Sequence, residues 1–254
     1  MYIDPNVIKT SWLFDSHFPF NIDIQPLLNY LKDNPVDIFG FGGDNWSLDC
    51  ISHHSEHEFK NIGYNNIAKR FQNEKVAFQD HLKRFREVLP KAKFVYLIGN
   101  HEVWLERFCI DHPQLEQPNL EGIITEALPG CEVIPQGQFY QIGKLNFCHG
   151  DNFGTANPAK QAVERCKQSV VFGHHHTFKV WPDFSMVSDL NKYVGIQVPC
   201  FTGRAPDYGR GRPNSWMNGF FKAIIKRNSG NFTPYVILVS PKGHFLSLDG
   251  KEYA

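Results

Sequence analysis

The chain has 254 residues, of which 42% are hydrophobic and 20% are charged, a composition typical of folded globular proteins. Lys plus Arg and Asp plus Glu each number 26, and the formal charge of zero argues against a general electrostatic grip on nucleic acid. Length and composition together exclude disordered chains, coiled coils and small proteins that need disulfide staples.

Through residue 175, short apolar runs rich in β-branched residues alternate with segments of helical periodicity. This alternation predicts an α/β layered fold. Strands are expected at Val7–Phe14, Val36–Phe41, Phe94–Ile98, Leu145–Cys148 and Val170–Phe172. Helices are expected at Ile22–Leu31, at Tyr64–Leu89, from Leu120 after an Asn119 cap, and from Pro158 after Asn157.

No repeat, low-complexity tract or Pro/Gly linker divides the chain, so a single domain over 1–254 is expected. Within it we expect a helical insertion at about 50–90 and a strand-rich C-terminal part at about 190–254. There is no secretory signal, no apolar run of membrane-spanning length and no CxxC pair. These features predict a cytoplasmic protein with free thiols and no membrane partner.

Five predicted strands end in short clusters of side chains that ligate metals. The clusters are Asp15-Ser16-His17, Gly43-Asp44, Asn100-His101-Glu102, His149-Gly150-Asp151 and His174-His175-His176. One such cluster would be a weak signal, but chance does not readily explain five clusters that each follow a predicted strand. Because sites in open α/β sheets lie at the carboxyl ends of the strands, these side chains should pool along one edge. Oxygen and imidazole ligands without thiolate suit Mn²⁺, Fe²⁺ or Zn²⁺.

The order of these blocks resembles the calcineurin-like metallophosphoesterase superfamily, in particular its small stand-alone members from bacteria and bacteriophages. The resemblance spans residues 15–176 and implies a four-layer αββα sandwich, with two mixed β-sheets flanked by helices. It assigns one metal to Asp15, His17 and His176, the other to Asn100, His149 and His174, and the bridging position to Asp44. His101 is implied as the catalytic histidine beside the metals.

The resemblance further implies a dinuclear metal-dependent phosphoesterase in which a hydroxide bridging the two metals attacks phosphorus. Two divalent ions are expected, Mn²⁺ first, with Fe²⁺ or Zn²⁺ as alternatives. The Ser/Thr protein phosphatase branch typically carries an arginine in the block that begins with Gly-Asp, and residues 43–50 contain none. We therefore favour a phosphodiester in a nucleotide or nucleic acid as the substrate. The alternatives are a phosphomonoesterase of the same fold and a catalytically silent metal-binding scaffold.

Two residues are candidates for substrate contacts. Trp46, which follows Asp44 closely, could wall the site and stack on a base or aryl group, as could Phe18 and Phe20; plain core packing is the alternative. Arg204, in the Gly/Pro-rich segment Gly203–Arg212, could grip phosphate, or the segment could be an ordinary solvated loop.

Two further features leave alternatives open. His53, His54 and His57 could bind an accessory metal or lie on a solvated or substrate-facing helix. Glu102 could orient an imidazole or simply be an acidic residue at a helix N-terminus. The sequence gives no signal for the oligomeric state.

Overall fold

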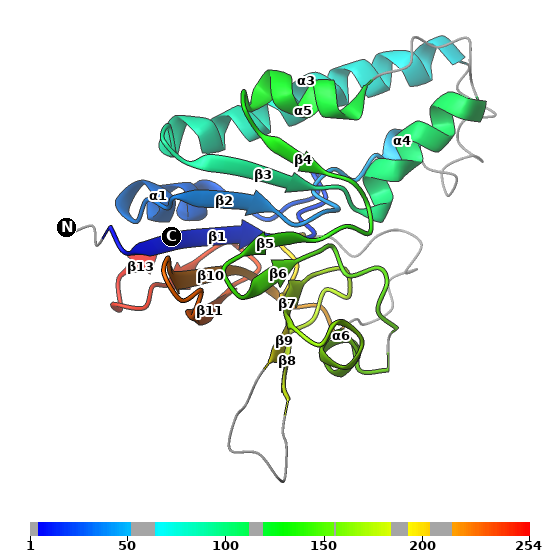
Figure 1. Cartoon of the computed structure of the whole chain (residues 1–254). Helices are drawn as coiled ribbons and strands as arrows, with labels where there is room; N and C mark the ends of the chain where they lie inside the picture. Colours follow the sequence, from blue (N-terminus) through cyan, green and yellow to red (C-terminus); the bar gives the residue numbers. More distant parts are fainter. Residues whose placement is uncertain (1–4, 52–63, 112–118, 155, 184–192, 204–214) are drawn as a thin grey trace.

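Two β-sheets packed face to face form the centre of the molecule (Figure 1). The computed structural model describes residues 5–51, 64–111, 119–154, 156–183, 193–203 and 215–254. The first sheet has six strands in the order β11-β10-β1-β2-β3-β4. Its strands are β1 (Val7–Leu13), β2 (Ile38–Phe41), β3 (Lys93–Leu97), β4 (Glu132–Ile134), β10 (Asn218–Lys226) and β11 (Phe232–Val239). The run β1 to β4 is parallel, and β10 and β11 extend it antiparallel.

The second sheet has five strands in the order β5-β6-β7-β9-β8. They are β5 (Tyr140–Ile142), β6 (Leu145–Phe147), β7 (Ser169–Phe172), β8 (Lys179–Pro182) and β9 (Val194–Gln197). The three central strands are parallel and the two edge strands are antiparallel. A small antiparallel ribbon pairs β12 (Phe245–Leu246) with β13 (Glu252–Tyr253).

Alternation of side chains along β1 divides the apolar core into two layers. Trp12 and Phe14 face the second sheet, where Trp12 stacks on Phe147 with 4.1 Å between ring centroids. Leu13, on the opposite face, belongs to the layer beneath the helices. This period of two is what a strand buried on both faces requires, and it makes β1 common to both layers.

Helices cover the two outer faces (Figure 1). They are α1 (Gln25–Asp33), α3 (Tyr64–Val88), α4 (Asn100–Asp111), α5 (Leu120–Ala127) and α6 (Pro158–Cys166), with a single 3₁₀ turn η1 at Asp49–Ile51. Apolar residues of α1, α3 and α5 pack on the first sheet, where Phe85 of α3 meets Phe39 and Phe41. On the other side, Ala159 of α6 packs with Phe172 of β7. The expected αββα sandwich of two mixed sheets is confirmed.

Most of the predicted elements form close to their expected bounds, including the N-caps of α5 and α6. The side chain of Asn119 accepts from the Gly122 N–H, and that of Asn157 from the Lys160 N–H. The sequence analysis missed α4 and the short strands β4, β5 and β8, while β9 lies in the strand-rich part expected at about 190–254. β4, β5 and β8 have three or four residues each and are partly exposed strands at sheet edges, whereas the equally short β6 and β7 are buried throughout.

All six cysteines are free, as expected. Among the described residues, no helix is both long and apolar enough to cross a bilayer.

Candidate metal centre

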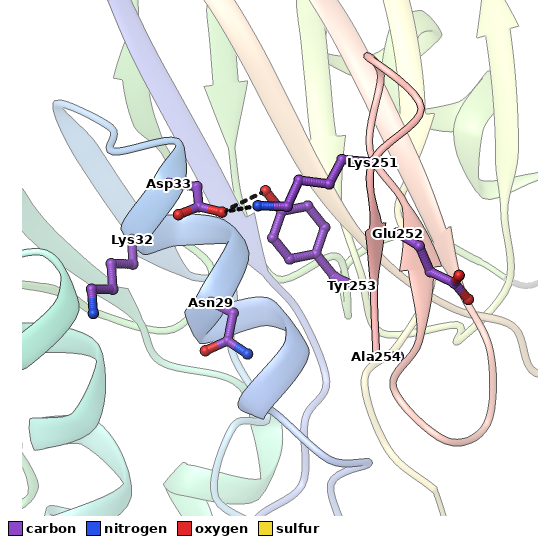
Figure 2. Close-up of a pocket in the computed structure, with 7 residues that line it drawn as sticks. All are labelled: Asn29, Lys32, Asp33, Lys251, Glu252, Tyr253 and Ala254. Carbon is purple, nitrogen blue, oxygen red and sulfur yellow. Dashed lines mark hydrogen bonds and ion pairs between the residues drawn. The ribbon is translucent and has the colours of Figure 1, made fainter.

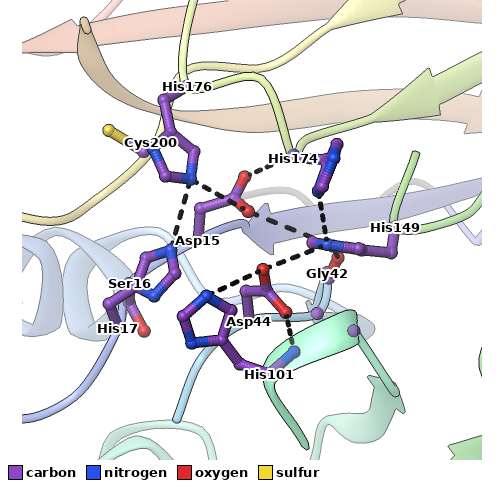
Figure 3. Close-up of polar contacts among 12 residues, drawn as sticks. Asp15, Ser16, His17, Gly42, Asp44, His101, His149, His174, His176 and Cys200 are labelled. Carbon is purple, nitrogen blue, oxygen red and sulfur yellow. Dashed lines mark hydrogen bonds and ion pairs between the residues drawn. The ribbon is translucent and has the colours of Figure 1, made fainter. Parts of the chain in front are cut away.

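The five clusters meet at one edge of the two sheets, as the strand order predicts (Figure 3). Each predicted ligand lies at the end of a strand or in the first turn of the helix that follows. Asp15 and His17 follow β1, Asp44 follows β2, Asn100 begins α4 after β3, His149 follows β6, and His174 and His176 follow β7. Because β1 and β2 belong to one sheet and β6 and β7 to the other, the centre lies where the two sheets meet.

Most of these residues have left-handed backbones, which is uncommon outside glycine. The φ angles are 49° at Asp15, 49° at His17, 49° at Asp44, 68° at His174 and 58° at His176. A non-glycine residue in this region costs on the order of 1–3 kcal/mol and persists where the surrounding structure over-determines it. The sharp bends turn consecutive side chains toward one point rather than to alternate faces of a strand.

The first group of ligand atoms joins Asp15, His17 and His176. Their ligand atoms lie within 4.8 Å of one another. The Nε2 atoms of His17 and His176 are 3.2 Å apart, and Nε2 of His176 is 3.5 Å from Oδ1 of Asp15. Asp15 is fully buried, and its Oδ1 has no hydrogen-bond partner, whereas Oδ2 accepts from the His174 N–H. A buried carboxylate oxygen that lies 3.5 Å from an imidazole nitrogen and has no hydrogen bond fits a cation ligand.

The second group centres on Nε2 of His149. This atom lies 3.0 Å from Oδ1 of Asn100, 3.2 Å from Oδ2 of Asp44 and 3.2 Å from Nδ1 of His174. The other ring nitrogen, Nδ1, is 3.1 Å from the Gly42 carbonyl, which can only accept, so Nδ1 carries a proton. In neutral His149 the Nε2 lone pair would therefore meet two acceptor oxygens, an unfavourable arrangement that a positive charge between them relieves.

The pKa of His149 reflects the same demand. Burial lowers this pKa, but the charges of Asp44 and Asp15 outweigh burial and raise it to about 10. A proton is one way to supply the positive charge that the group needs, and a divalent cation is another.

Asp44 lies between the two groups. It shares one set of ligand atoms with His149 and His174 and another with His17 and His101. Figure 3 shows its carboxylate between the rings of His101 and His149. A carboxylate in this position is placed to bridge two cations, the role that the resemblance implies.

The protonation states of His17, His174 and Asp44 suit metal binding. Burial, then the neighbouring His101 and His176, lowers the pKa of His17 to about 3, and burial followed by His149 lowers the pKa of His174. Burial would raise the pKa of Asp44, but the charges of His149 and His101 hold it well below its usual value. Neutral imidazoles and an ionised carboxylate are the forms that bind metal.

His101 is oriented by its backbone and by one ring nitrogen. Its N–H donates to Oδ1 of Asp44 (2.8 Å), and Nδ1 donates to the Ser47 carbonyl (2.8 Å). The remaining nitrogen, Nε2, faces the centre at 3.9 Å from Oδ2 of Asp44. Nε2 is therefore the ring nitrogen of His101 that can contact a ligand bound beside Asp44.

Glu102 holds the loop that carries Asp44. Its carboxyl group is fully buried and accepts five hydrogen bonds. Four come from the backbone N–H groups of Asp44, Asn45, Trp46 and Gly99, and the fifth comes from the Tyr96 hydroxyl. Burial and the charge of Asp44 raise the pKa of Glu102. Of the two interpretations, Glu102 does lie in the first turn of a helix, but its partners are backbone groups and a phenol and not an imidazole.

Two aromatic residues that the sequence analysis considered for substrate contacts pack against α3. Trp46 is fully buried, stacks on Phe78 at 4.6 Å and on Phe71 at 5.7 Å, and donates from Nε1 to Glu74. The interpretation of Trp46 as a substrate wall is therefore wrong: the ring turns toward α3, where apolar packing stabilises it. Phe18 also packs on Phe78.

Other interpretations lie outside the described residues. These concern Arg204 with residues 205–212 of its segment, and the histidines His53, His54 and His57.

One surface cavity is separate from the centre (Figure 2). It measures about 380 Å³ and lies between α1 and β13. Within it, the Lys251 ammonium and the Tyr253 hydroxyl both donate to Oδ2 of Asp33, at 2.5 and 3.0 Å. None of its lining residues belongs to the groups around Asp44.

Comparison with known proteins gives matches in structure alone. No family model matches the sequence, and no curated protein matches it significantly. Similar solved structures include wild-type Vps29 from Entamoeba histolytica complexed with Zn²⁺, 12% identical, covering 96% of each chain with a TM-score of 0.47. A predicted phosphoesterase from Streptococcus pneumoniae is 11% identical over 97% of each chain, with a TM-score of 0.41. Vps29 from Chaetomium thermophilum is 12% identical over 96% of this chain and 93% of that chain, with a TM-score of 0.43. At such values the likenesses say nothing of what this chain binds or does.

We predict that Glu102→Gln destabilises both the fold and the centre. The amide NH₂ would face backbone N–H donors, leaving buried groups unsatisfied, so unfolding free energy should fall by at least about 2 kcal/mol. Mn²⁺ affinity should fall roughly 10–100-fold, because the loop that carries Asp44 loses its support. Denaturant unfolding and calorimetric titration measure the two effects. Glu106→Gln, exposed on the same helix, is the matched control, and equal behaviour of the two variants would contradict this role.

We predict that Asp44→Asn weakens binding of both cations, whereas His17→Ala weakens mainly one. Asp44 takes part in two of the ligand groups and would lose its charge, while the His17 change leaves His149 and His174 in place. Elemental analysis and Mn²⁺ titration give the stoichiometry, with Asp80→Asn on the exposed face of α3 as the control. Two tightly bound equivalents in Asp44→Asn would contradict a bridging position.

Proposed function

We propose that this chain is a metal-dependent phosphoesterase that holds two divalent cations around Asp44. The observation that supports this is the pair of ligand groups, Asp15–His17–His176 and Asp44–His149–His174, with Asn100 beside the second. Buried carboxylates and imidazoles that converge from both sheets at one edge suit hard to borderline divalent ions. Mn²⁺ is the proposed native metal, with Fe²⁺ and Zn²⁺ as alternatives.

The chain's residues would hold the ions and set the charge of the site. Divalent ions in such a pair lower the pKa of water and neutralise the phosphoryl oxygens. Asp15 and Asp44 are the two carboxylates of the ligand groups, so a pair of divalent ions would leave the centre positively charged. That charge would attract the anionic phosphate ester, and the partly exposed His174 and Asn100 lie where the centre is open to solvent.

His101 is the proposed proton donor to the leaving oxygen. Its Nδ1 bond to Ser47 fixes the ring and leaves Nε2 directed at the centre. Protonated at Nε2, His101 would neutralise the alkoxide that forms as the ester bond breaks. The hydrogen bond from the His101 backbone N–H to the Asp44 carboxylate holds this proposed proton donor beside the proposed bridging ligand.

The favoured substrate is a phosphodiester of a nucleotide or nucleic acid. Support comes from residues 43–50, which lack the arginine typical of the protein phosphatase branch. The alternative substrate is a phosphomonoester, and the alternative function is a catalytically silent metal-binding scaffold. The following experiment distinguishes these alternatives.

We expect metal-free protein to be inactive and Mn²⁺ to restore hydrolysis of bis(p-nitrophenyl) phosphate. The physical reason is that protein groups alone supply too little positive charge for the phosphoryl oxygens. Rates on this diester and on p-nitrophenyl phosphate are compared before EDTA, after EDTA and after Mn²⁺ addition. Hydrolysis that survives complete metal removal would contradict the mechanism, a higher rate on the monoester would favour the phosphatase, and inactivity with two bound metals would favour the scaffold.

We expect His101→Asn to retain two metals yet lose about 10²–10⁴-fold in rate on esters with poor leaving groups. With p-nitrophenolate, which needs little protonation, the loss should be smaller. Steady-state rates on an alkyl and a nitrophenyl diester, in one preparation of verified metal content, measure the difference. Equal losses on both esters would instead indicate that His101 binds phosphoryl oxygens.

A further inference from the structure

Five aromatic rings form a continuous run across the metal centre. The run passes from Trp104 through His101, His17 and His176 to Trp216, with successive centroid distances of 3.9, 4.6, 5.1 and 4.2 Å. Its three imidazoles, shown in Figure 3, are buried. Both indoles at its ends are partly exposed. Each end of the run is therefore a flat apolar group that solvent reaches beside the centre.

Local structure places each indole. Trp104 lies one turn after His101 on α4, so the two rings share a helix face and pack together with a tilt of 33° between their planes. Trp216 lies just before β10 and meets His176 edge-on, at 80°. The N–H of the next residue, Met217, donates to the His176 carbonyl (2.8 Å), which holds Trp216 beside its partner ring.

The other three tryptophans differ in position or burial. Trp12 and Trp46 are fully buried in the two core layers. Trp181 is 37% exposed, but it lies on the edge strand β8, where Lys160 of α6 lies 5.6 Å from its ring. Of the five tryptophans, Trp104 and Trp216 alone combine partial exposure with contact to a centre residue.

We infer that Trp216 determines substrate specificity by stacking on the nucleobase of the substituent that stays on phosphorus. The inference rests on the proposed function, in which His101 protonates the leaving oxygen. Trp104 packs against His101 and so lies on the leaving-group side, while Trp216 lies at the far end of the run. A nucleoside matches this end, because a base stacks on an indole whatever its sequence identity, and stacking is worth roughly 5- to 150-fold in affinity.

Binding of the product of such a reaction tests the inference directly. Protein loaded with Mn²⁺ is titrated calorimetrically with thymidine 5′-monophosphate and with methyl phosphate, which share the phosphate but differ in the nucleoside. We expect the parent protein to bind the nucleotide at least about 5-fold more tightly. Trp216→Leu should abolish this ratio and Trp216→Phe should retain most of it. Trp104→Leu and the surface control Trp181→Leu should leave the ratio unchanged.

Three results would overturn the inference. One is a parent protein that binds both ligands equally, and another is a Trp216→Leu protein that keeps the parent ratio. The third is an equal loss of affinity for both ligands in Trp216→Leu, which is the outcome of a merely structural role. Hydrolysis of the p-nitrophenyl ester of thymidine 5′-monophosphate decides the proposed function separately. Trp216-dependent nucleotide binding without hydrolysis would contradict the phosphoesterase and leave the recognition role standing.

Discussion

The buried carboxyl group of Glu102 is the interaction on which the geometry of the centre depends. It accepts from three consecutive backbone N–H groups at 44–46, from the Gly99 N–H and from the Tyr96 hydroxyl. These backbone groups lie beyond the ends of the strands, where the sheet ladder no longer pairs them, and they would otherwise be buried without partners. Because Glu102 is on α4 and Asp44 follows β2, the carboxyl group joins two strand ends of the first sheet. His101, its neighbour on the helix, donates its own backbone N–H to Oδ1 of Asp44.

The same loop connects the centre to the outer helical layer. Trp46 continues the loop into the core, where its indole stacks on the α3 residues Phe71 and Phe78 and donates to Glu74. The position of Asp44 is thus set from two sides, by Glu102 through the backbone and by α3 through Trp46. Tight packing of this kind can hold the left-handed backbones at Asp15, His17 and Asp44, whose conformational cost would otherwise favour relaxation.

The two sheets contribute different parts of the centre. The first supplies Asp15, His17 and Asp44, together with Asn100 and His101 at the start of α4, and the second supplies His149, His174 and His176. The apolar layer between the sheets, which includes Trp12 stacked on Phe147, fixes the distance between these halves. Packing in this apolar layer therefore determines whether ligand atoms from the two sheets lie close enough to bind one ion.

The sequence by itself determined the layered α/β class, most of the longer elements and the residues that meet at the centre. This was possible because apolar periodicity marks strands and helices, and because parallel strands bring their carboxyl ends to one edge wherever the rest of the chain goes.

The tertiary structure alone decided which way side chains beyond the strand ends point. In the sequence, Trp46 lies two residues after Asp44 and Trp216 lies two residues before β10. The structure buries Trp46 against α3 but places Trp216 beside His176. Glu102 was visible as an acidic residue, but its five donors come from β3 and from the segments that follow β2 and β3. Such directions depend on the left-handed turns and on packing between segments distant in sequence, and no local pattern of residue types encodes them.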